Sequence, residues 1–387
     1  MTGLSHFDPM IDRRGTSSSK WEKYAGSDVL PFWVADMDFA APEAVVEAIR
    51  RRVAHPVFGY EQRSDGLVEA VRRWLAERHG WQVPAEQLMF CPPSTIVGMI
   101  GLVTRLVEPG AAVACHVPGY GPLFRLVEDN GRRLVRCPLI ERGGRFHLDA
   151  DDLGRRLTDD VRMLILCNPH NPTGRVFSGA ELGAVAELAE ERGLYVVSDE
   201  VHADLVMPGH RHIPFGRVGG ERTVTVISPN KAFNTAGLPQ STFIIPDRRV
   251  RATFAAFLDT MQLNHDSTFG AVAAEAAYRD GAAWLDALLE YLDGNHRLLR
   301  SFLAARLPTI RVAPAEGTYL AWLDFRETGL GEEELMRRLV ERGGVGLYPG
   351  TAFGPEGEGF FRMNLACPRE TLQRGLEGIA RALSVPL

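Results

Sequence analysis

The chain has 387 residues, of which 45% are hydrophobic and 24% are charged, proportions typical of a globular protein in water. Its formal net charge of −6 at pH 7 argues against a nucleic-acid partner, because such proteins normally present a basic face. The longest apolar run, "TIVGMIGLV", is much shorter than the roughly 20 residues of a membrane span, so no membrane association is expected.

The cysteines and the N-terminus indicate the compartment. The five cysteines are odd in number and form no C-x-x-C pair, so neither a disulfide framework nor a zinc site is predicted. The N-terminal residues "MTGLSHFDPMIDRRG" contain charges but lack the apolar core of a signal peptide. We therefore expect a cytoplasmic protein without a metal site.

The middle of the chain alternates strand-like and helix-like patterns. Strands are predicted at 111–117, 132–139, 162–169, 194–200 and 223–230, and helices at 120–131 and 179–193. This alternation predicts a parallel sheet that is covered by helices on both faces. Ligands bind such sheets at the carboxyl ends of the strands.

The C-terminal part of the chain has a different pattern. A long amphipathic helix at 286–307 is followed by strand-like pieces at 318–325 and 360–366 and by helices around 332–343 and 370–383, which indicates a smaller α+β domain. The first 45 residues show no pattern of their own and are expected to pack onto it. We predict an N-terminal segment at 1–48, a large domain at 49–284 and a small domain at 285–387.

Three motifs fall at the ends of predicted strands. The first, "CNPHNPTG", would by itself be typical of a simple turn. Asp199, in "YVVSDE", would by itself be read as a helix cap. Lys231, in "TVTVISPNK", would by itself be a surface charge. A lysine held in a cleft is different, because its pKa can fall and its free amine can then react with an aldehyde.

The order and spacing of these motifs resemble the fold-type I pyridoxal 5′-phosphate (PLP) enzymes, the aspartate aminotransferase superfamily, over essentially the whole chain. "FRMNLA" near the C-terminus is a fourth match. Within the superfamily the chain is most similar to cystathionine β-lyases and cysteine S-conjugate C–S lyases, through "LPFWVADMDF", "CNPHNPTGRVF", "SDEVHADLV" and "KAFNTAGL". The resemblance implies an α/β fold in which a mostly parallel seven-stranded sheet lies between helices, beside a smaller α+β domain.

The resemblance also implies roles toward the cofactor. Lys231 would hold PLP covalently and, once freed by the substrate, would move the Cα proton as acid and base. Asp199 would pair with the protonated pyridine nitrogen, and Asn171 would hydrogen-bond the ring hydroxyl and border the substrate. Tyr120 would stack on the ring and assist the leaving group, and His202 occupies a position where the lyase branch carries histidine.

On the substrate side, the resemblance implies that Arg362 clamps the α-carboxylate with its two-pronged guanidinium group. Trp33 would edge the substrate pocket, although simple packing would equally explain a tryptophan there. Tyr60 resembles a tyrosine that reaches the PLP phosphate and the substrate of the neighbouring subunit, so a homodimer with shared active sites is expected.

Two positions near the expected phosphate site depart from the family pattern. The residue before the lysine is usually Ser or Thr, whose hydroxyl binds the phosphate, but here it is Asn230. The earlier phosphate loop usually reads P-G-V-V, but here it reads "PPST", in which Pro93 removes an N–H group. Ser94 and Thr95 add hydroxyls that would replace the one lost at position 230, and Ser228 is a further donor. We therefore predict that Ser94, Thr95, Ser228 and Asn230 all belong to the cofactor-binding site.

The leading functional prediction is β-elimination from an L-cysteine S-conjugate or cystathionine, which yields a thiol, pyruvate and ammonia. Two alternatives stay open. One is the oxygen-dependent decarboxylation and oxidative deamination of an S-cysteine conjugate to an aldehyde, a route that branch members take in antibiotic biosynthesis, so a role in secondary metabolism is also expected. The other is transamination. A binding protein or regulator without turnover is disfavoured, because it would not need a proton-shuttling lysine.

Overall fold

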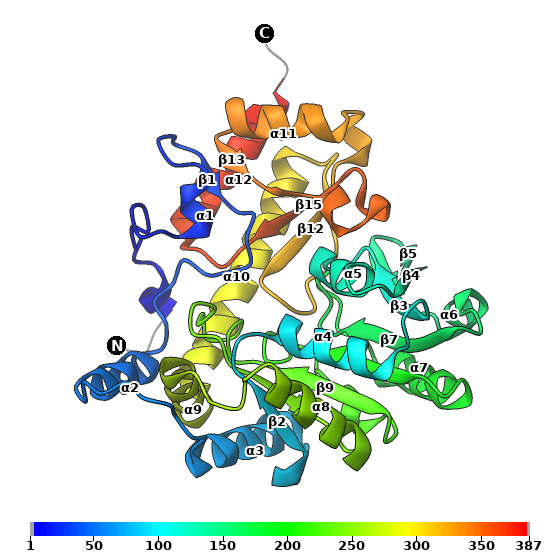
Figure 1. Cartoon of the computed structure of the whole chain (residues 1–387). Coiled ribbons are helices and arrows are strands. Elements are labelled where there is room, and N and C mark those ends of the chain that lie inside the picture. Colours follow the sequence, from blue (N-terminus) through cyan, green and yellow to red (C-terminus); the bar gives the residue numbers. More distant parts are fainter. Residues whose placement is uncertain (1–3, 385–387) are drawn as a thin grey trace.

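The computed structural model describes residues 4–384 and contains a large and a small sheet, each with its own helices (Figure 1). The strands of the large sheet are β2 Leu88–Cys91, β3 Ala112–Val117, β4 Arg133–Pro138, β7 Val161–Cys167, β8 Tyr195–Asp199, β9 Thr223–Ile227 and β10 Ser241–Ile244. Their spatial order is β2-β10-β9-β8-β7-β3-β4. Only β10 runs antiparallel to its neighbours, so the predicted mostly parallel seven-stranded sheet is confirmed.

Helices cover both faces of the large sheet. They are α3 Asp65–His79, α4 Thr95–Leu106, α5 Gly121–Glu128, α6 Ala150–Arg156, α7 Gly179–Glu191, α8 Arg248–Thr260 and α9 Thr268–Asp280, and α2 Glu43–Val53 packs against α9. One apolar cluster joins the sheet to α4, α5 and α8, and another joins it to α6 and α7. Successive residues of β3 alternate between the two clusters, because side chains of a strand point to opposite faces.

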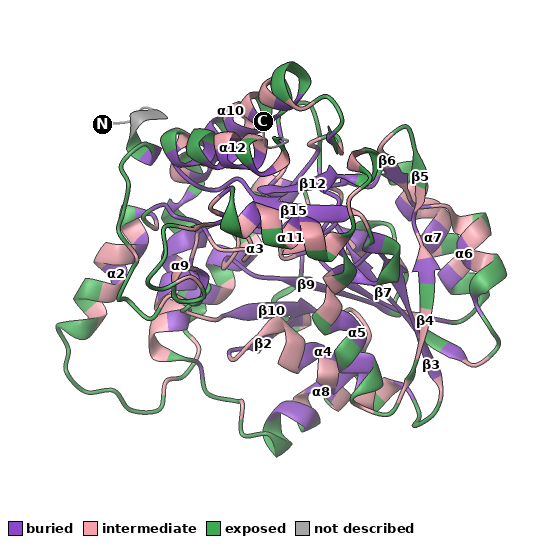
Figure 2. Cartoon of the chain, turned by 90° about the horizontal axis from the view of Figure 1, so that it is seen from above, coloured by how far each residue is buried: buried purple, intermediate pink, exposed green. Residues whose placement is uncertain are grey.

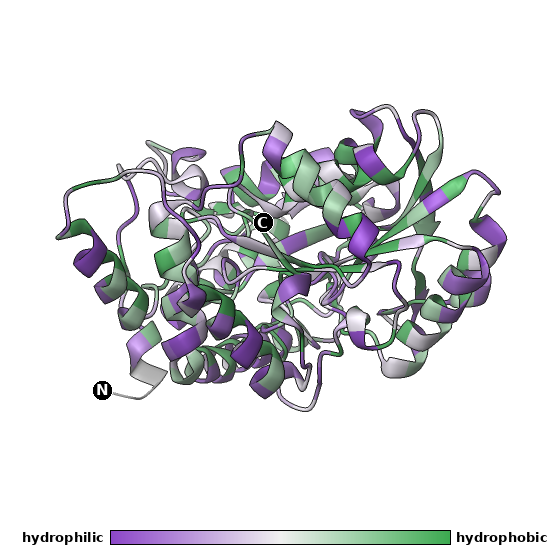
Figure 3. Cartoon of the chain, turned by 60° about the horizontal axis from the view of Figure 1, so that its bottom comes forward, coloured by the Kyte–Doolittle hydropathy of each residue, from purple (hydrophilic) through white to green (hydrophobic). Residues whose placement is uncertain are grey.

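Burial on both faces explains the strand sequences. All five residues of β9, "TVTVI", and all six of β3, "AVACHV", are buried. Figures 2 and 3 show the result: the central strands are buried and largely hydrophobic, whereas the outer faces of the helices are exposed and hydrophilic. The helix α7 begins with a capping box between Ser178 and Glu181, which satisfies backbone N–H groups at its start.

The small sheet confirms the predicted α+β unit. Its strands are antiparallel, in the order β11 Arg311–Val312, β12 Leu320–Asp324, β15 Phe360–Asn364 and β14 Tyr348–Pro349. The long helix α10 Ala282–Arg306 leads into it, and α11 Glu332–Glu341 and α12 Arg369–Leu383 pack beside it (Figure 1). The domain boundaries after residues 48 and 284 stay predictions.

The remaining elements are short. The strands β5 Ile140–Arg142 and β6 Arg145–His147 form a hairpin, and 3-10 helices lie at Leu4–Phe7, Ala85–Gln87, Phe215–Arg217, Arg326–Thr328, Gly350–Phe353 and Pro355–Gly357. Within residues 4–384, no helix has both the length and the apolar character that a membrane crossing requires.

The N-terminal segment contacts both units. It contains α1 Ser19–Glu22 and β1 Leu30–Pro31, and β1 pairs in parallel with β13 Val345–Gly346. Phe32 lies in the apolar core of the small unit, whereas Phe39 lies in the core formed with α3, α9 and α10. The stretch between these two phenylalanines therefore crosses from one core to the other.

Candidate active site

A cavity of about 440 Å³ lies at the carboxyl ends of the parallel strands, between the large and the small sheet. The strands β2, β3, β7, β8 and β9 all end at this edge, so the residues that follow them meet there. The predicted site residues that line it are Trp33, Ser94, Thr95, Tyr120, Asn171, Asp199, His202, Ser228, Asn230, Lys231 and Arg362. Tyr60 does not line it and is 90% exposed.

Lys231 follows β9 and extends its amine across the cavity to the N-terminal segment. Its Nζ donates a hydrogen bond to the carbonyl oxygen of Ala35 at 2.8 Å, and Tyr319 Oη donates to the same oxygen at 2.9 Å. Burial and the nearby positive charge of Arg362 lower the pKa of Lys231 to about 8. Near neutral pH, the fraction of Lys231 present as the neutral, nucleophilic amine is therefore larger than for an ordinary lysine.

Asp199 is the last residue of β8 and is only 5% exposed. One carboxylate oxygen accepts a hydrogen bond from Val201 N at 3.3 Å, and no ion pair with it is found among the described residues. Burial raises the pKa of Asp199 to about 6. A buried carboxylate without a cationic partner suits the protonated ring nitrogen of a ligand.

Arg362 projects from β15 and is held by two acceptors. Its Nη1 donates to Asn171 Oδ1 at 2.9 Å and its Nη2 donates to the Trp33 carbonyl at 2.8 Å, whereas Nε is buried and has no partner within residues 4–384. Burial lowers the pKa of Arg362 to about 10, so the group remains a cation. Because Asn171 accepts with its oxygen, its Nδ2 is left to donate toward the cavity.

His202 and Tyr120 are neutral groups of the cavity wall. His202 is 2% exposed, and its Nδ1 has no hydrogen-bond partner in the described part of the chain. Burial lowers the pKa of His202 well below its usual value, so the imidazole is uncharged at neutral pH. Tyr120 precedes α5, and burial raises the pKa of its phenol, which therefore keeps its proton.

These features fit PLP. The unpaired nitrogens of His202 and Arg362 and the uncompensated carboxylate of Asp199 are polar groups that a bound ligand would satisfy. Ser94 caps α4, accepting a hydrogen bond from Val97 N at 3.1 Å, so the N-terminus of that helix borders the cavity and suits a phosphate. Among residues 4–384, no cluster of His, Cys, Asp and Glu could hold a metal ion.

Two aromatic residues of the small unit that were not predicted, Tyr348 and Phe353, also line the cavity. The guanidinium carbon of Arg362 lies 5.1 Å from the Tyr348 ring centroid and 4.9 Å from that of Phe353. Tyr348 pairs with Arg362 across β14 and β15. No motif marks these aromatic residues; the pairing of β14 with β15 brings Tyr348 to the site, and the 3-10 helix Gly350–Phe353 brings Phe353.

A buried ion-pair cluster anchors the loop that carries Asn171. Arg175 lies in this loop and pairs with Glu316 of the small unit and with Glu181 of α7. Glu316 also accepts from Val176 N at 3.1 Å and from Arg145 Nε at 2.7 Å. The cluster thus connects the loop to α7 and to the small unit, although neither Arg175 nor Glu316 was predicted as a functional residue.

Comparison with known proteins places this site in a family. The family described as "Aminotransferase class I and II" matches residues 27–379 of this chain. "Cystathionine beta-lyase PatB" of Bacillus subtilis (strain 168) is 43% identical over 98% of this chain and 100% of its own length. "Protein MalY" of Escherichia coli (strain K12) is 32% identical, with 97% of this chain and 98% of that protein covered.

Solved structures give the same result. Cystalysin from Treponema denticola, which contains PLP, has a TM-score of 0.94 at 30% identity, with 97% of this chain and 98% of that chain covered. The PLP-bound C–S lyase from Staphylococcus hominis complexed with L-cycloserine has a TM-score of 0.93 at 32% identity, with 99% and 100% covered. The predicted cofactor and the resemblance to the C–S lyase branch are confirmed, and the chain belongs to the aminotransferase class I and II family of PLP-dependent enzymes.

Proposed function

We propose that this enzyme cleaves the Cβ–S bond of an L-cysteine S-conjugate or of cystathionine. The reaction consumes one water molecule and releases a thiol, pyruvate and ammonia. The observation that carries the proposal is the lysine amine of lowered pKa that shares one cavity with the Arg362 guanidinium group. The relatives named as a cystathionine β-lyase and a C–S lyase support the same bond.

The first chemical step is the removal of the Cα proton. When bound, PLP withdraws electrons from the Cα atom of an attached amino acid. Arg362 would bind the α-carboxylate and so orient the Cα–H bond, while Lys231 Nζ would accept the proton. Asn171, Asp199 and His202 would hold the ring with the polar atoms that face the cavity.

The second step is the departure of sulfur from Cβ. Tyr120 is a neutral phenol in the cavity wall, and its hydroxyl would donate a proton or a hydrogen bond to the leaving thiolate. Trp33 and Tyr348 lie 5.9 Å apart between ring centroids and would border the group carried by the sulfur. The proton that Lys231 holds is then available to return to the product.

Product analysis tests this proposal. Purified enzyme should release thiol and pyruvate in equal amounts from S-alkyl and S-aryl conjugates of L-cysteine and from cystathionine, at the same rate with and without oxygen. Oxygen uptake with an aldehyde product would instead establish oxidative decarboxylation and deamination. Transfer of the amino group to 2-oxoglutarate or pyruvate without thiol release would establish transamination.

We also propose that two copies of the chain share their active sites. Tyr60 lies outside the cavity of its own subunit, in an exposed loop with Val57 and Phe58, which are 64% and 54% exposed. Apolar exposure of this kind is typical of an interaction surface, and a tyrosine there would reach the phosphate end of the partner's cavity.

Subunit mixing tests the shared site. Lys231→Ala and Tyr60→Ala homodimers should each be weakly active, but a mixed dimer would contain one site with both residues intact. Random exchange gives about half mixed dimers with one intact site in two, so activity should recover to about a quarter of the wild-type value. Recovery to no more than the average of the two parents would show that Tyr60 serves its own subunit.

A further inference from the structure

The side chain of Asn230 is fully occupied by the loop to which it belongs. Its Nδ2 donates to the carbonyl oxygens of Thr235 and Leu238, the latter at 3.0 Å. Its Oδ1 accepts from Gln240 N at 3.2 Å and from the Ser228 hydroxyl. A side-chain amide has two N–H donors and one carbonyl oxygen with two lone pairs. No donor of Asn230 is therefore left for an anion.

These hydrogen bonds close the loop 228–240 that joins β9 to β10. Ser228 Oγ lies 2.8 Å from the carbonyl oxygen of Gln240, and Thr235 N donates to the Asn230 carbonyl at 3.0 Å. Asn230 thus connects the beginning, the middle and the end of the loop. Lys231 is the next residue, so its backbone is held on one side by this closure.

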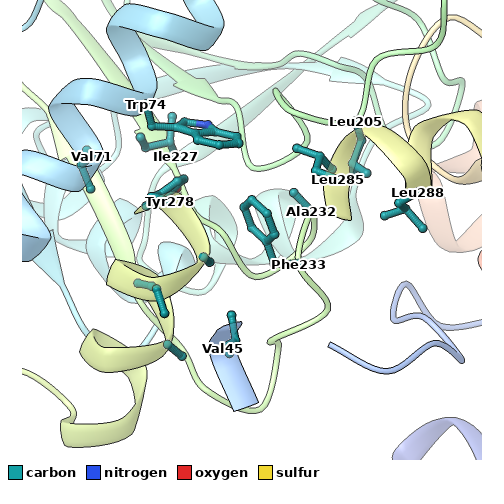
Figure 4. Close-up of a cluster of buried hydrophobic side chains, with 14 of the residues drawn as sticks. Val45, Val71, Trp74, Leu205, Ile227, Ala232, Phe233, Tyr278, Leu285 and Leu288 are labelled. Carbon is teal, nitrogen blue, oxygen red and sulfur yellow. The ribbon is translucent and has the colours of Figure 1, made fainter. Parts of the chain in front are cut away.

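The other side of Lys231 is held by the apolar core. Ala232 and Phe233 are completely buried, and Figure 4 shows both within the cluster that contains Trp74 and Tyr278. The ring of Phe233 lies 5.6 Å from that of Trp74 between centroids. Lys231 therefore lies between the hydrogen-bonded Asn230 and the buried pair 232–233, and its amine points into the cavity.

A serine or threonine at position 230 would not make this closure. A hydroxyl has one donor, so it cannot satisfy the Thr235 and Leu238 carbonyls together while also accepting from Gln240 N. The donors that remain for a phosphate lie elsewhere, at Ser94 and at Thr95, the first residue of α4.

We propose that Asn230 is a positioning residue that sets the loop carrying Lys231 and does not bind the cofactor phosphate. Its hydrogen bonds hold the loop in the conformation in which the amine reaches the cofactor aldehyde. Binding of the phosphate then depends on the N-terminus of α4 with Ser94 and Thr95.

Comparison of PLP with pyridoxal, which lacks the phosphate, tests this assignment in the full-length apo-protein without any substrate. Asn230→Ala should lower the affinity for both compounds by a similar factor, about tenfold, because the amine is misplaced in either case. It should also lower the apo-protein's unfolding midpoint. The matched variant Thr95→Val should lower the PLP affinity by about tenfold, yet leave pyridoxal affinity and apo-protein stability unchanged.

Two further readouts separate positioning from general support. The pH midpoint of the visible absorption of the PLP-loaded protein should shift in Asn230→Ala and stay unchanged in Thr95→Val, because only the former moves the amine. Asn230→Ser, a smaller perturbation, should lose pyridoxal affinity as Asn230→Ala does. A variant at position 230 that loses PLP affinity but keeps pyridoxal affinity, apo-protein stability and the pH midpoint would overturn the proposal.

Discussion

Two walls of the cavity treat their polar groups in opposite ways. In the loop 228–240, the side chains of Ser228 and Asn230 are engaged within the loop itself. Elsewhere in the cavity, by contrast, Asp199 is buried and forms no ion pair, and His202 Nδ1 and Arg362 Nε lack hydrogen-bond partners, among residues 4–384. The side chains of Ser228 and Asn230 have their hydrogen-bond partners in the folded protein, whereas Asp199, His202 and Arg362 keep capacity that a ligand would use.

The difference distinguishes residues that bind a ligand from residues that stabilise the fold. An unsatisfied buried polar group costs about 1–3 kcal/mol, so a fold keeps several in one cavity only where binding offsets that cost. A saturated group such as the Asn230 amide instead contributes to the stability of the free protein. Residue identity alone does not make this distinction, because an asparagine can do either.

Replacement of Lys231, the reactive residue of the loop 228–240, should give the largest effect. Lys231→Ala should abolish the visible absorption of the cofactor complex and reduce turnover by ~10³-fold or more, because both covalent capture and proton transfer are lost. Absorption spectra and steady-state rates measure this, and the circular dichroism spectrum serves as the control for folding. A Lys231→Ala protein that keeps the absorption band would show that another amine captures the cofactor.

Replacement of Arg362 removes the cation that we propose binds the substrate α-carboxylate. Arg362→Leu should lower kcat/KM by ~10²- to 10³-fold, since a buried hydrogen-bonded charge pair with the substrate contributes about 2–5 kcal/mol. The absorption of the bound cofactor should change little. Arg362→Lys, the matched variant, keeps the charge but not the two-pronged geometry, and should recover only part of the loss. If both variants kept wild-type kcat/KM, the carboxylate would be bound elsewhere.

Asp199→Asn should stabilise the apo-protein and weaken cofactor binding. The pKa of Asp199 is raised to about 6 in the folded apo-protein. Ionisation of Asp199 therefore destabilises the folded state once the pH rises above the lower pKa that this carboxyl has in the unfolded chain. Asp199→Asn should therefore stabilise the apo-protein by about 3 kcal/mol at pH 7, and the gain should fall below about 1 kcal/mol at pH 4. Urea unfolding at the two pH values measures this; an equal gain at both would exclude ionisation as the cause.

The smallest effect concerns the pKa of Lys231, where the two walls meet. The Arg362 guanidinium lowers this pKa and the Asp199 carboxylate raises it. Arg362→Leu should thus move the pKa of Lys231 upward from about 8, and Asp199→Asn should move it downward, each by about 0.5–1 unit. The pH dependence of reductive methylation of Lys231 in the apo-protein by a small neutral aldehyde reports both shifts. Shifts of the same sign would show that burial, not charge, is the controlling factor.

The sequence was most informative where chemistry and strand ends coincide. The strands that lead to Asn171, Asp199 and Lys231 are mostly apolar, and parallel pairing brings their carboxyl ends to one edge of the sheet. For that reason the mostly parallel sheet and the meeting of these side chains at one edge were predictable, whereas the cofactor followed from the resemblance to the fold-type I PLP enzymes. Tyr60 was predicted for a partner's site, and that role stays a prediction.

The sequence by itself determined the order of elements, the family and the set of side chains at the strand ends, because periodicity and motifs are local. Only the tertiary structure decided what each side chain does there. Tyr348 and Phe353 reach the cavity through the pairing of β14 with β15 and through the packing of the small unit. Asn230 stands where the family usually carries a phosphate-binding hydroxyl and was predicted to bind the cofactor, yet its amide is occupied by Thr235, Leu238 and Gln240. Hydrogen-bond saturation depends on positions brought together by folding, and no local pattern records it.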